Sequence, residues 1–160
     1  VQIDNARFFS QSNKLVYDEA VEVETVAKHL ADQCQQYTQY GGARPIGVSL
    51  IIGGVDSNGS TLYLTDPSGS YILYNAIAIG GNADVANDFL EKNYNENMTF
   101  DDAMMLAIST IQNSNVNSNE IEHIKMSQIK SDSNEFEFIN NKKIKQLSDQ
   151  AKIKYPSEKK

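Results

Sequence analysis

Apolar residues recur at helical spacing over residues 23–37, in the clearest amphipathic pattern of the chain. The stripe consists of Val23, Val26, Ala27, Leu30, Ala31, Cys34 and Tyr37. These positions fall on one face of a helix, while polar residues fill the other face. The pattern predicts a helix over residues 22–37, ended by Gly41 and Gly42. Residues 3–15 predict the end of another helix before it.

Three apolar segments with a period of two follow, over residues 46–55, 62–65 and 71–79. Residues 56–59 (Asp-Ser-Asn-Gly) separate the first two segments, and residues 66–69 (Asp-Pro-Ser-Gly) separate the last two. Both tetrapeptides begin with Asp and end with Gly, which is typical of type I turns. We therefore predict an antiparallel meander of three strands.

Two further helices are predicted in the second half of the chain. The first covers residues 83–94, and its expected buried side consists of Val85, Ala86, Phe89 and Leu90. The second begins at Thr99, whose hydroxyl is expected to cap the free amides of a first turn that contains Asp101 and Asp102. Its apolar stripe consists of Ala103, Leu106, Ala107 and Ile111.

A hairpin and a last short helix complete the predicted elements. Residues 121–129 and 135–139 flank a polar turn at residues 131–134, and Phe136 and Phe138 share one strand face. Ile144 and Leu147 indicate the helix. The order α-α-β-β-β-α-α-β-β-α predicts an α+β protein with helices layered on antiparallel sheet.

Composition restricts the class of protein and its partners. The chain has 160 residues, 40% of them hydrophobic, which is enough for one globular domain or a large piece of one. Its net charge of −7 argues against nucleic acid as a partner, because binding phosphate needs an excess of cations. No apolar run approaches the ~20 residues that a membrane span needs, so no membrane partner is expected.

The charge is divided unevenly along the chain. Residues 140–160 contain seven lysines and two acidic residues, so the acidic excess lies entirely in residues 1–139. The basic segment is interpreted either as a solvated C-terminal tail or as a docking or localisation tail, and both interpretations stay open.

The residues that catalysis or metal binding requires are scarce. Cys34 lies on the apolar stripe, where a buried, inert thiol is expected, and His29 lies on the polar face of the same helix. A single cysteine excludes any cysteine-pair metal site, and no Gly-x-Ser-x-Gly segment is present. The sequence therefore predicts no catalytic residue, no metal ligand and no cofactor.

Two long segments resemble the signature of alpha-type subunits of the 20S proteasome. The first is residues 37–52 (YTQYGGARPIGVSLII), followed by Gly54-Val55-Asp56, and the second is residues 65–71 (TDPSGSY), followed by residues 76–80 (AIAIG). The resemblance continues at residues 5–7, 15–19, 89–92, 99–107, 121–128 and 136–147. It implies the N-terminal-nucleophile hydrolase fold, a four-layer αββα sandwich.

The resemblance also implies a domain division. Members of the family carry a gating segment, a helix and the first strand pairs before the helix that ends near residue 15. This chain is therefore expected to lack the first strands of the sandwich. Residues 1–139 would form a partial alpha-type domain, and residues 140–160 a short helix and a basic tail.

Alpha-type subunits are non-catalytic, because the nucleophilic threonine stands at the mature N-terminus of beta-type subunits. Position 1 of this chain is Val1. The resemblance implies a structural subunit of the alpha ring, which gates substrate entry and docks to the catalytic beta ring in ubiquitin- and ATP-dependent protein degradation. Its expected partners are other alpha and beta subunits and activator particles, in the cytoplasm and nucleus. His29, Gln33 and Gln36 are candidates for contacts between the rings.

Two other functions stay open at this point. The chain would be a fragment of a catalytic beta-type or related threonine peptidase if an upstream segment supplied the nucleophile. Alternatively, it would be an interaction module that uses its lysine tail. We also expect the isolated chain to be unstable or to self-associate, because missing strands leave sheet edges and apolar faces open.

Overall fold

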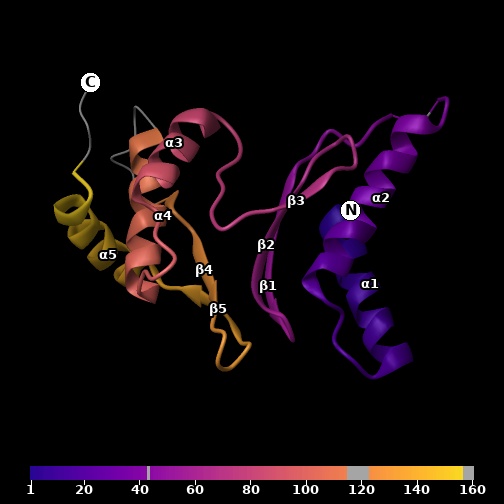
Figure 1. Cartoon of the computed structure of the whole chain (residues 1–160), viewed down its shortest axis with the longest axis horizontal. Helices are drawn as coiled ribbons and strands as arrows, with labels where there is room; N and C mark the ends of the chain where they lie inside the picture. Colours follow the sequence, from indigo (N-terminus) through magenta and orange to yellow (C-terminus); the bar gives the residue numbers. More distant parts are fainter. Residues whose placement is uncertain (43, 115–122, 157–160) are drawn as a thin grey trace. The chain divides into compact units, whose positions relative to one another are not determined.

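The computed structural model describes residues 1–42, 44–114 and 123–156, and the chain forms two compact units. Unit 1 comprises Val1–Asn75 with Ile129–Glu135, and unit 2 comprises Ala76–Gln128 with Phe136–Lys160. Helices and antiparallel sheet occur together in the chain (Figure 1), so the predicted α+β class is confirmed.

Unit 1 packs two helices on one face of a three-stranded sheet. Its elements are α1 (Gln2–Tyr17), α2 (Val23–Gln39), β1 (Leu50–Asp56), β2 (Gly59–Thr65) and β3 (Tyr71–Leu73). The strands are antiparallel and lie in the order β1-β2-β3, so the predicted meander is confirmed. In Figure 1 both helices lie on the same side of this sheet.

The two predicted turns join these strands. The backbone N–H of Asn58 donates to Asp56 Oδ1 at 2.8 Å, and that of Ser68 donates to Asp66 Oδ1 at 2.7 Å. Gly69 ends the second turn with a φ of +92°, a conformation that glycine adopts without a steric penalty. Both predicted turns are therefore present, and each is closed by its first aspartate.

The first strand is shorter than predicted at its start. It begins at Leu50 rather than Ile46, because Leu50 pairs with Thr65 and β2 ends there. Residues 46–49 therefore extend past the end of their partner strand. The alternating apolar pattern of the sequence therefore continues past the last residue of this segment that has a partner in β2.

The third strand is shorter than predicted at its end. It stops at Leu73 rather than Ile79. The side-chain amide of Asn87 binds the backbone of Ala78 instead, accepting from its N–H at 2.7 Å and donating to its carbonyl at 3.0 Å. A side chain from α3 thus takes the hydrogen bonds that a strand neighbour would make.

The stripe of α2 forms most of the core of unit 1. The buried residues are Val23, Ala27, Leu30, Ala31 and Cys34. Val23 and Ala27 pack against Tyr63 of β2. Tyr37 was expected on the same stripe but is 46% exposed. The turn at Gly69 meets α2 at Ala31 and Gln35, so the end of α2 that carries Tyr37 extends past this contact.

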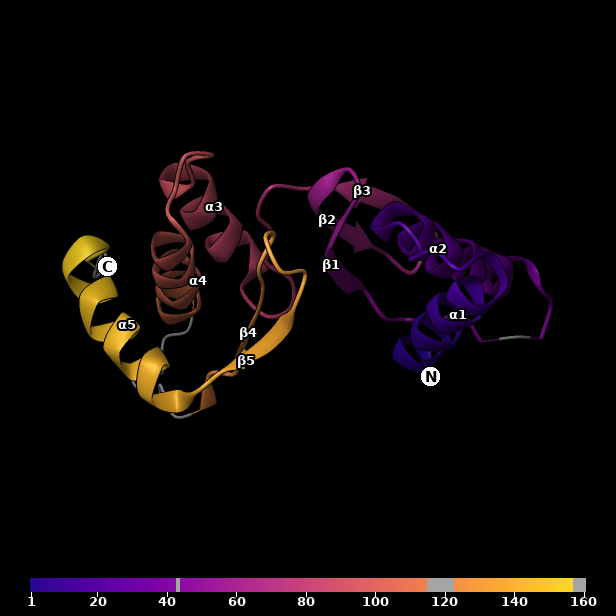
Figure 2. The same ribbon diagram turned by 90° about the horizontal axis from the view of Figure 1, so that it is seen from below.

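Unit 2 packs three helices with a two-stranded sheet. Its elements are α3 (Ala83–Asn93), α4 (Phe100–Ser114), β4 (Met126–Ile129), β5 (Phe136–Ile139) and α5 (Asn141–Lys154). Figure 2 shows α4 between α3 and α5. The hairpin of β4 and β5 is confirmed, although the described strand begins at Met126 and residues 121 and 122 lie outside the described ranges.

The predicted buried stripe of α4 is confirmed at Leu106 and is wrong at Ala103, Ala107 and Ile111. The buried residues are Met104, Met105, Leu106, Ile108, Ser109 and Thr110. Ile111 is 41% exposed, and Ala103 and Ala107 are exposed as well. Both faces of this helix are apolar, and the packing of α5 decides which of them is buried, since Ile144 of α5 joins the core cluster around Ile108. In α3, Val85 was likewise expected to be buried but is 52% exposed.

The last helix is longer than predicted. Ile144, Leu147 and Ala151 are buried, and α5 extends to Lys154. Lys143 Nζ lies 3.7 Å from Asp101 Oδ1, and Lys154 Nζ lies 2.5 Å from Asp102 Oδ1. Much of the expected basic tail is thus a packed helix. The division of the chain at residue 139 stays a prediction.

Candidate functional site

The only cysteine of the chain is a core residue. Cys34 is 3% exposed, and Gln2 Nε2 donates to its Sγ at 3.9 Å. Burial, with a smaller contribution from the charge of Asp66, raises the pKa of this thiol. A buried thiol with a raised pKa stays protonated and is a poor nucleophile. The prediction of a buried thiol is confirmed.

The residues proposed for contacts between rings differ in exposure. His29 is half-buried and stacks on Phe9 of α1, with ring centroids 4.0 Å apart and an interplanar angle of 6°. Gln33 Nε2 lies 3.3 Å from His29 Nε2, and Asn5 Nδ2 donates to Gln33 Oε1 at 3.4 Å. Both residues therefore join α2 to α1. Gln36 is exposed, and a role between rings stays a prediction for all three.

No metal site is found among residues 1–42, 44–114 and 123–156, since no three His, Cys, Asp or Glu side chains cluster there. Within the same ranges, no helix combines the length and the apolarity that crossing a membrane requires. The expectation that the chain has no catalytic, cofactor-binding or metal-binding residue stays a prediction.

The start of α2 is fixed to the tip of the β1–β2 hairpin by Asp56. The backbone N–H of Val23 donates to Asp56 Oδ2 at 2.9 Å, and Asn58 Nδ2 donates to Glu22 Oε1 at 3.5 Å. A carboxylate at this position satisfies a free amide at the positive end of the helix. A Cβ on Gly54 would lie 2.6 Å from Val23 Cγ2, so the helix approaches β1 as closely as a glycine allows.

The middle of α2 is held equally closely by the second turn. A Cβ on Gly69 would lie 2.6 Å from Gln35 Cβ and 2.9 Å from the carbonyl oxygen of Ala31. Two glycines, one at each end of the contact, thus let α2 lie directly on the sheet. Val23, which packs closely against Gly54, also lines a neighbouring pocket.

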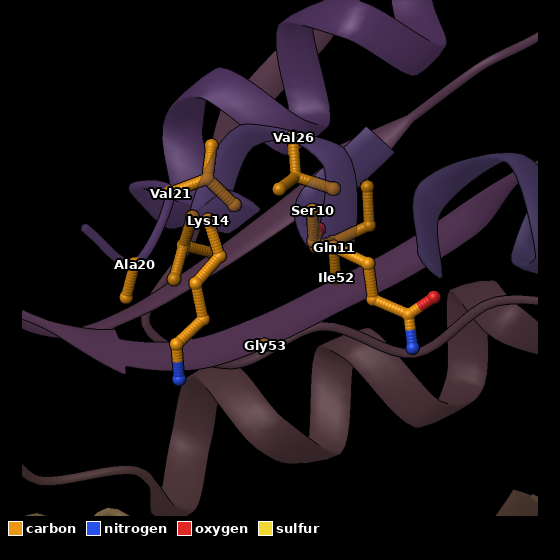
Figure 3. Close-up of a pocket in the computed structure, with 9 residues that line it drawn as sticks. Ser10, Gln11, Lys14, Ala20, Val21, Val26, Ile52 and Gly53 are labelled. Carbon is orange, nitrogen blue, oxygen red and sulfur yellow. The ribbon is translucent and has the colours of Figure 1, made fainter. Parts of the chain in front are cut away.

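The pocket lies between α1, α2 and β1 and has a volume of about 430 Å³ (Figure 3). Its apolar walls come from the segment before α2, from α2 itself and from β1. The lining residues are Ser10, Gln11, Lys14, Ala20, Val21, Val23, Val26, Ile52 and Gly53. Its size lies within the range of pockets that bind small molecules or side chains.

The polar groups of the pocket come from α1. Figure 3 shows the side chains of Gln11 and Lys14 extending in the same direction on either side of Gly53. Ser10 Oγ donates to the carbonyl oxygen of Ala6 at 2.8 Å and keeps its acceptor capacity. Lys14 has no ion pair within the described ranges. The pocket therefore offers apolar walls, an amide and one free cation.

Sequence reasoning missed this pocket, because its residues come from separate segments with no common motif. One signal was available in the glycine pair of β1. Glycine inside a strand often indicates that a ligand or another backbone approaches closely. Gly54 makes such an approach to α2, and Gly53 lines the pocket.

Comparison with known proteins gives one consistent family. Residues 1–129 match the family model described as proteasome subunit. The chain is 46% identical over 111 residues to "Proteasome subunit alpha" of Saccharolobus islandicus (strain L.S.2.15 / Lassen #1), an alignment that covers 69% of this chain and 46% of the relative. It is 42% identical over 151 residues to "Proteasome subunit alpha" of Archaeoglobus fulgidus, covering 94% of this chain and 61% of the relative. The chain thus spans about half the length of the curated relatives it matches.

Proposed function

Because this chain belongs to the proteasome subunit family, we propose that it is a non-catalytic alpha subunit of the 20S core particle. The observation that carries the proposal is the identity of 42% over 94% of the chain with a relative named as an alpha subunit. The buried, protonated thiol of Cys34 is a poor nucleophile, which agrees with a non-catalytic role.

The proposed role is structural. The chain occupies the alpha ring with other alpha subunits, docks to the catalytic beta ring and takes part in gating and in binding activator particles. This role belongs to ubiquitin- and ATP-dependent protein degradation in the cytoplasm and nucleus. Gln36 supports docking through the helix layer, because it is exposed on α2 and free to meet a neighbouring subunit.

The four-layer sandwich is part of the same proposal. In unit 1, Ile52 packs under α2, so its neighbour Ile51 points to the opposite sheet face, where it is 42% exposed. In unit 2, Ile139 packs against the helices, whereas Phe138 points away from them and is 81% exposed. Each sheet thus has one face under helices and one open apolar face, as expected for sheets whose second faces are covered in a sandwich.

Sedimentation tests the proposal. The chain is tagged, expressed in cells of its source organism and separated on a density gradient, and fractions are assayed for peptide hydrolysis. We expect the chain to sediment with a large particle that cleaves peptides. A chain that is well expressed but absent from the peptidase fractions would overturn the proposal.

A covalent probe for N-terminal threonine nucleophiles tests the non-catalytic character. Added to the purified particle, the probe should label other chains and leave this chain unlabelled. Labelling of this chain would instead identify it as a catalytic subunit of the beta type.

A further inference from the structure

The turn between β1 and β2 contains the only Asn-Gly pair of the chain, Asn58-Gly59. Gly59 has a φ of +101°, so the tightness of the turn favours glycine at this position. The side chain of Asn58 is exposed. The turn therefore places a side-chain amide directly before a residue that has no side chain.

This pair brings together an amide carbon and the backbone nitrogen that can attack it. The nitrogen of the residue after an asparagine can close a ring on Cγ of that asparagine, and a Cβ on the following residue hinders the approach. Gly59 has no Cβ, and one built there would meet no atom of the described residues within 4 Å, its chain neighbours apart. Since the reacting atoms belong to adjacent residues, the reaction does not depend on which other segment covers the sheet.

The pairing of Gly59 with Asp56 restrains the attack without preventing it. The two residues are partners at the last position of the β1–β2 ladder. The end of a hairpin opens locally more readily than its centre, and an opened turn frees the nitrogen of Gly59.

We propose that Asn58 is a site of spontaneous deamidation, and that the reaction releases the start of α2 from the β1–β2 turn. The nitrogen of Gly59 attacks Cγ of Asn58, the bond from Cγ to Nδ2 breaks, and ammonia leaves with the proton of that nitrogen. Water then opens the cyclic imide at either of its carbonyl groups. The products are aspartate and isoaspartate, and in isoaspartate the backbone runs through Cγ.

The hydrogen bonds of the turn explain why the start of α2 would respond. Asn58 Nδ2 donates to Glu22 Oε1 at 3.5 Å, and deamidation replaces this donor with a carboxylate beside Glu22. Isoaspartate also lengthens the backbone of a loop of two residues. Asp56, which accepts from Val23 at 2.9 Å and from Asn58 at 2.8 Å, would then no longer hold both N–H groups.

Peptide mass spectrometry of aged protein tests the chemical step. The tagged chain is purified with the subunits that accompany it and kept in mildly alkaline buffer, which promotes loss of the proton from the attacking nitrogen. We expect the exchange of –NH2 for –OH to accumulate at Asn58, with isoaspartate and aspartate peptides separated by chromatography. The internal control is Asn134, an exposed asparagine with a φ of +55° that is followed by Glu135 and should change far more slowly.

Hydrogen exchange tests the structural consequence. Residues 22–26 should lose protection as the unmodified chain ages. Asn58→Gln, which keeps the amide and needs a larger ring, is aged in parallel and should retain the protection of these residues. Circular dichroism before ageing checks that the variant is folded.

Three results would overturn the inference. They are an unchanged Asn58 in the aged chain, equal rates at Asn58 and Asn134, and equal loss of protection in the unmodified chain and in Asn58→Gln. The proposed role as an alpha subunit does not depend on this turn chemistry, so it would stand after any of the three.

Discussion

Asp56 is the residue that joins the start of α2 to the β1–β2 turn. Its two carboxylate oxygens accept from Val23 and Asn58 at 2.9 and 2.8 Å. Replacing it with alanine leaves both N–H groups without these acceptors. Asp56→Ala is therefore expected to lower the free energy of unfolding by about 1 kcal/mol, as loss of a helix cap does.

Urea denaturation measures this effect. The matched control is Asp32→Ala, an exposed aspartate in the interior of the same helix, which should change stability little. Equal effects of the two substitutions would show that Asp56 does not hold the helix.

Asp102 of α4 and Lys154 of α5 form an ion pair whose contribution to stability depends on pH. The hydrogen bond from Lys154, followed by that from Thr99, lowers the pKa of Asp102, and the same contact with Asp102 raises the pKa of Lys154. The contribution of Asp102 to stability is fully present above the pKa that this carboxyl has in the unfolded chain. It is lost as the pH falls through the lowered pKa of the folded chain. The contribution of Lys154 is lost only as pH rises through its raised value.

The pair is therefore expected to stabilise α4 and α5 at neutral pH and not in acid. Lys154→Ala should lower the melting temperature at pH 7, and the difference from the unmodified chain should shrink as pH falls below the pKa of Asp102. Lys142→Ala, at an exposed position of the same helix, is the control. A difference that stays constant down to acidic pH would contradict the assignment.

At the scale of elements, the contact of α2 with the turn at residues 66–69 depends on Gly69. A Cβ there would meet the backbone of α2, and the φ of +92° adds strain for any other residue. Gly69→Ala is expected to cost about 2 kcal/mol or more in thermal or urea unfolding. Gly47→Ala is the matched control, since a Cβ there meets nothing within 4 Å. Equal losses of stability for Gly69→Ala and Gly47→Ala would mean that the contact of the turn with α2 does not depend on Gly69.

The two faces of α4 give a direct test of its packing. Ile108 is fully buried, whereas Ile111 is 41% exposed. Ile108→Ala should cost about 3 kcal/mol and Ile111→Ala about 1 kcal/mol or less, by urea denaturation. A larger loss of stability for Ile111→Ala than for Ile108→Ala would contradict this packing and support the buried stripe that the sequence predicted.

The α2 stripe and the two Asp-to-Gly turns are local signals, and the structure confirms them. The buried face of α4 depends on the position of α5, and the ends of β1 and β3 depend on Thr65 and Asn87. These are contacts between distant segments, which local periodicity does not encode.

The pocket was unpredictable for the same reason. The helical pattern around Lys14 does not predict that this residue lies beside apolar side chains. The strand pattern around Ile52 likewise does not predict that Ile52 lines a pocket. These two residues come together where α1 and α2 lie over β1, with Val23 of α2 packed closely against Gly54. Only the glycine pair in the strand hinted at a close approach.

At the scale of the whole molecule, family membership was the strongest prediction. The segments at residues 37–52 and 65–71 indicated it, and the family model over residues 1–129 confirms it. The second segment specifies a turn together with the ends of the two strands that it joins, which periodicity alone does not. The four-layer arrangement and the tendency to self-associate stay predictions, supported by open apolar residues such as Ile72 and Phe138.

The central claim is that this chain is a subunit of the alpha ring. Native mass spectrometry of the particle captured through a tag on this chain measures the claim most directly. We predict a particle in which this chain occurs with other alpha subunits and with catalytic beta subunits. Recovery of the chain only as a monomer or a homo-oligomer, while the core particle assembles without it, would contradict the account.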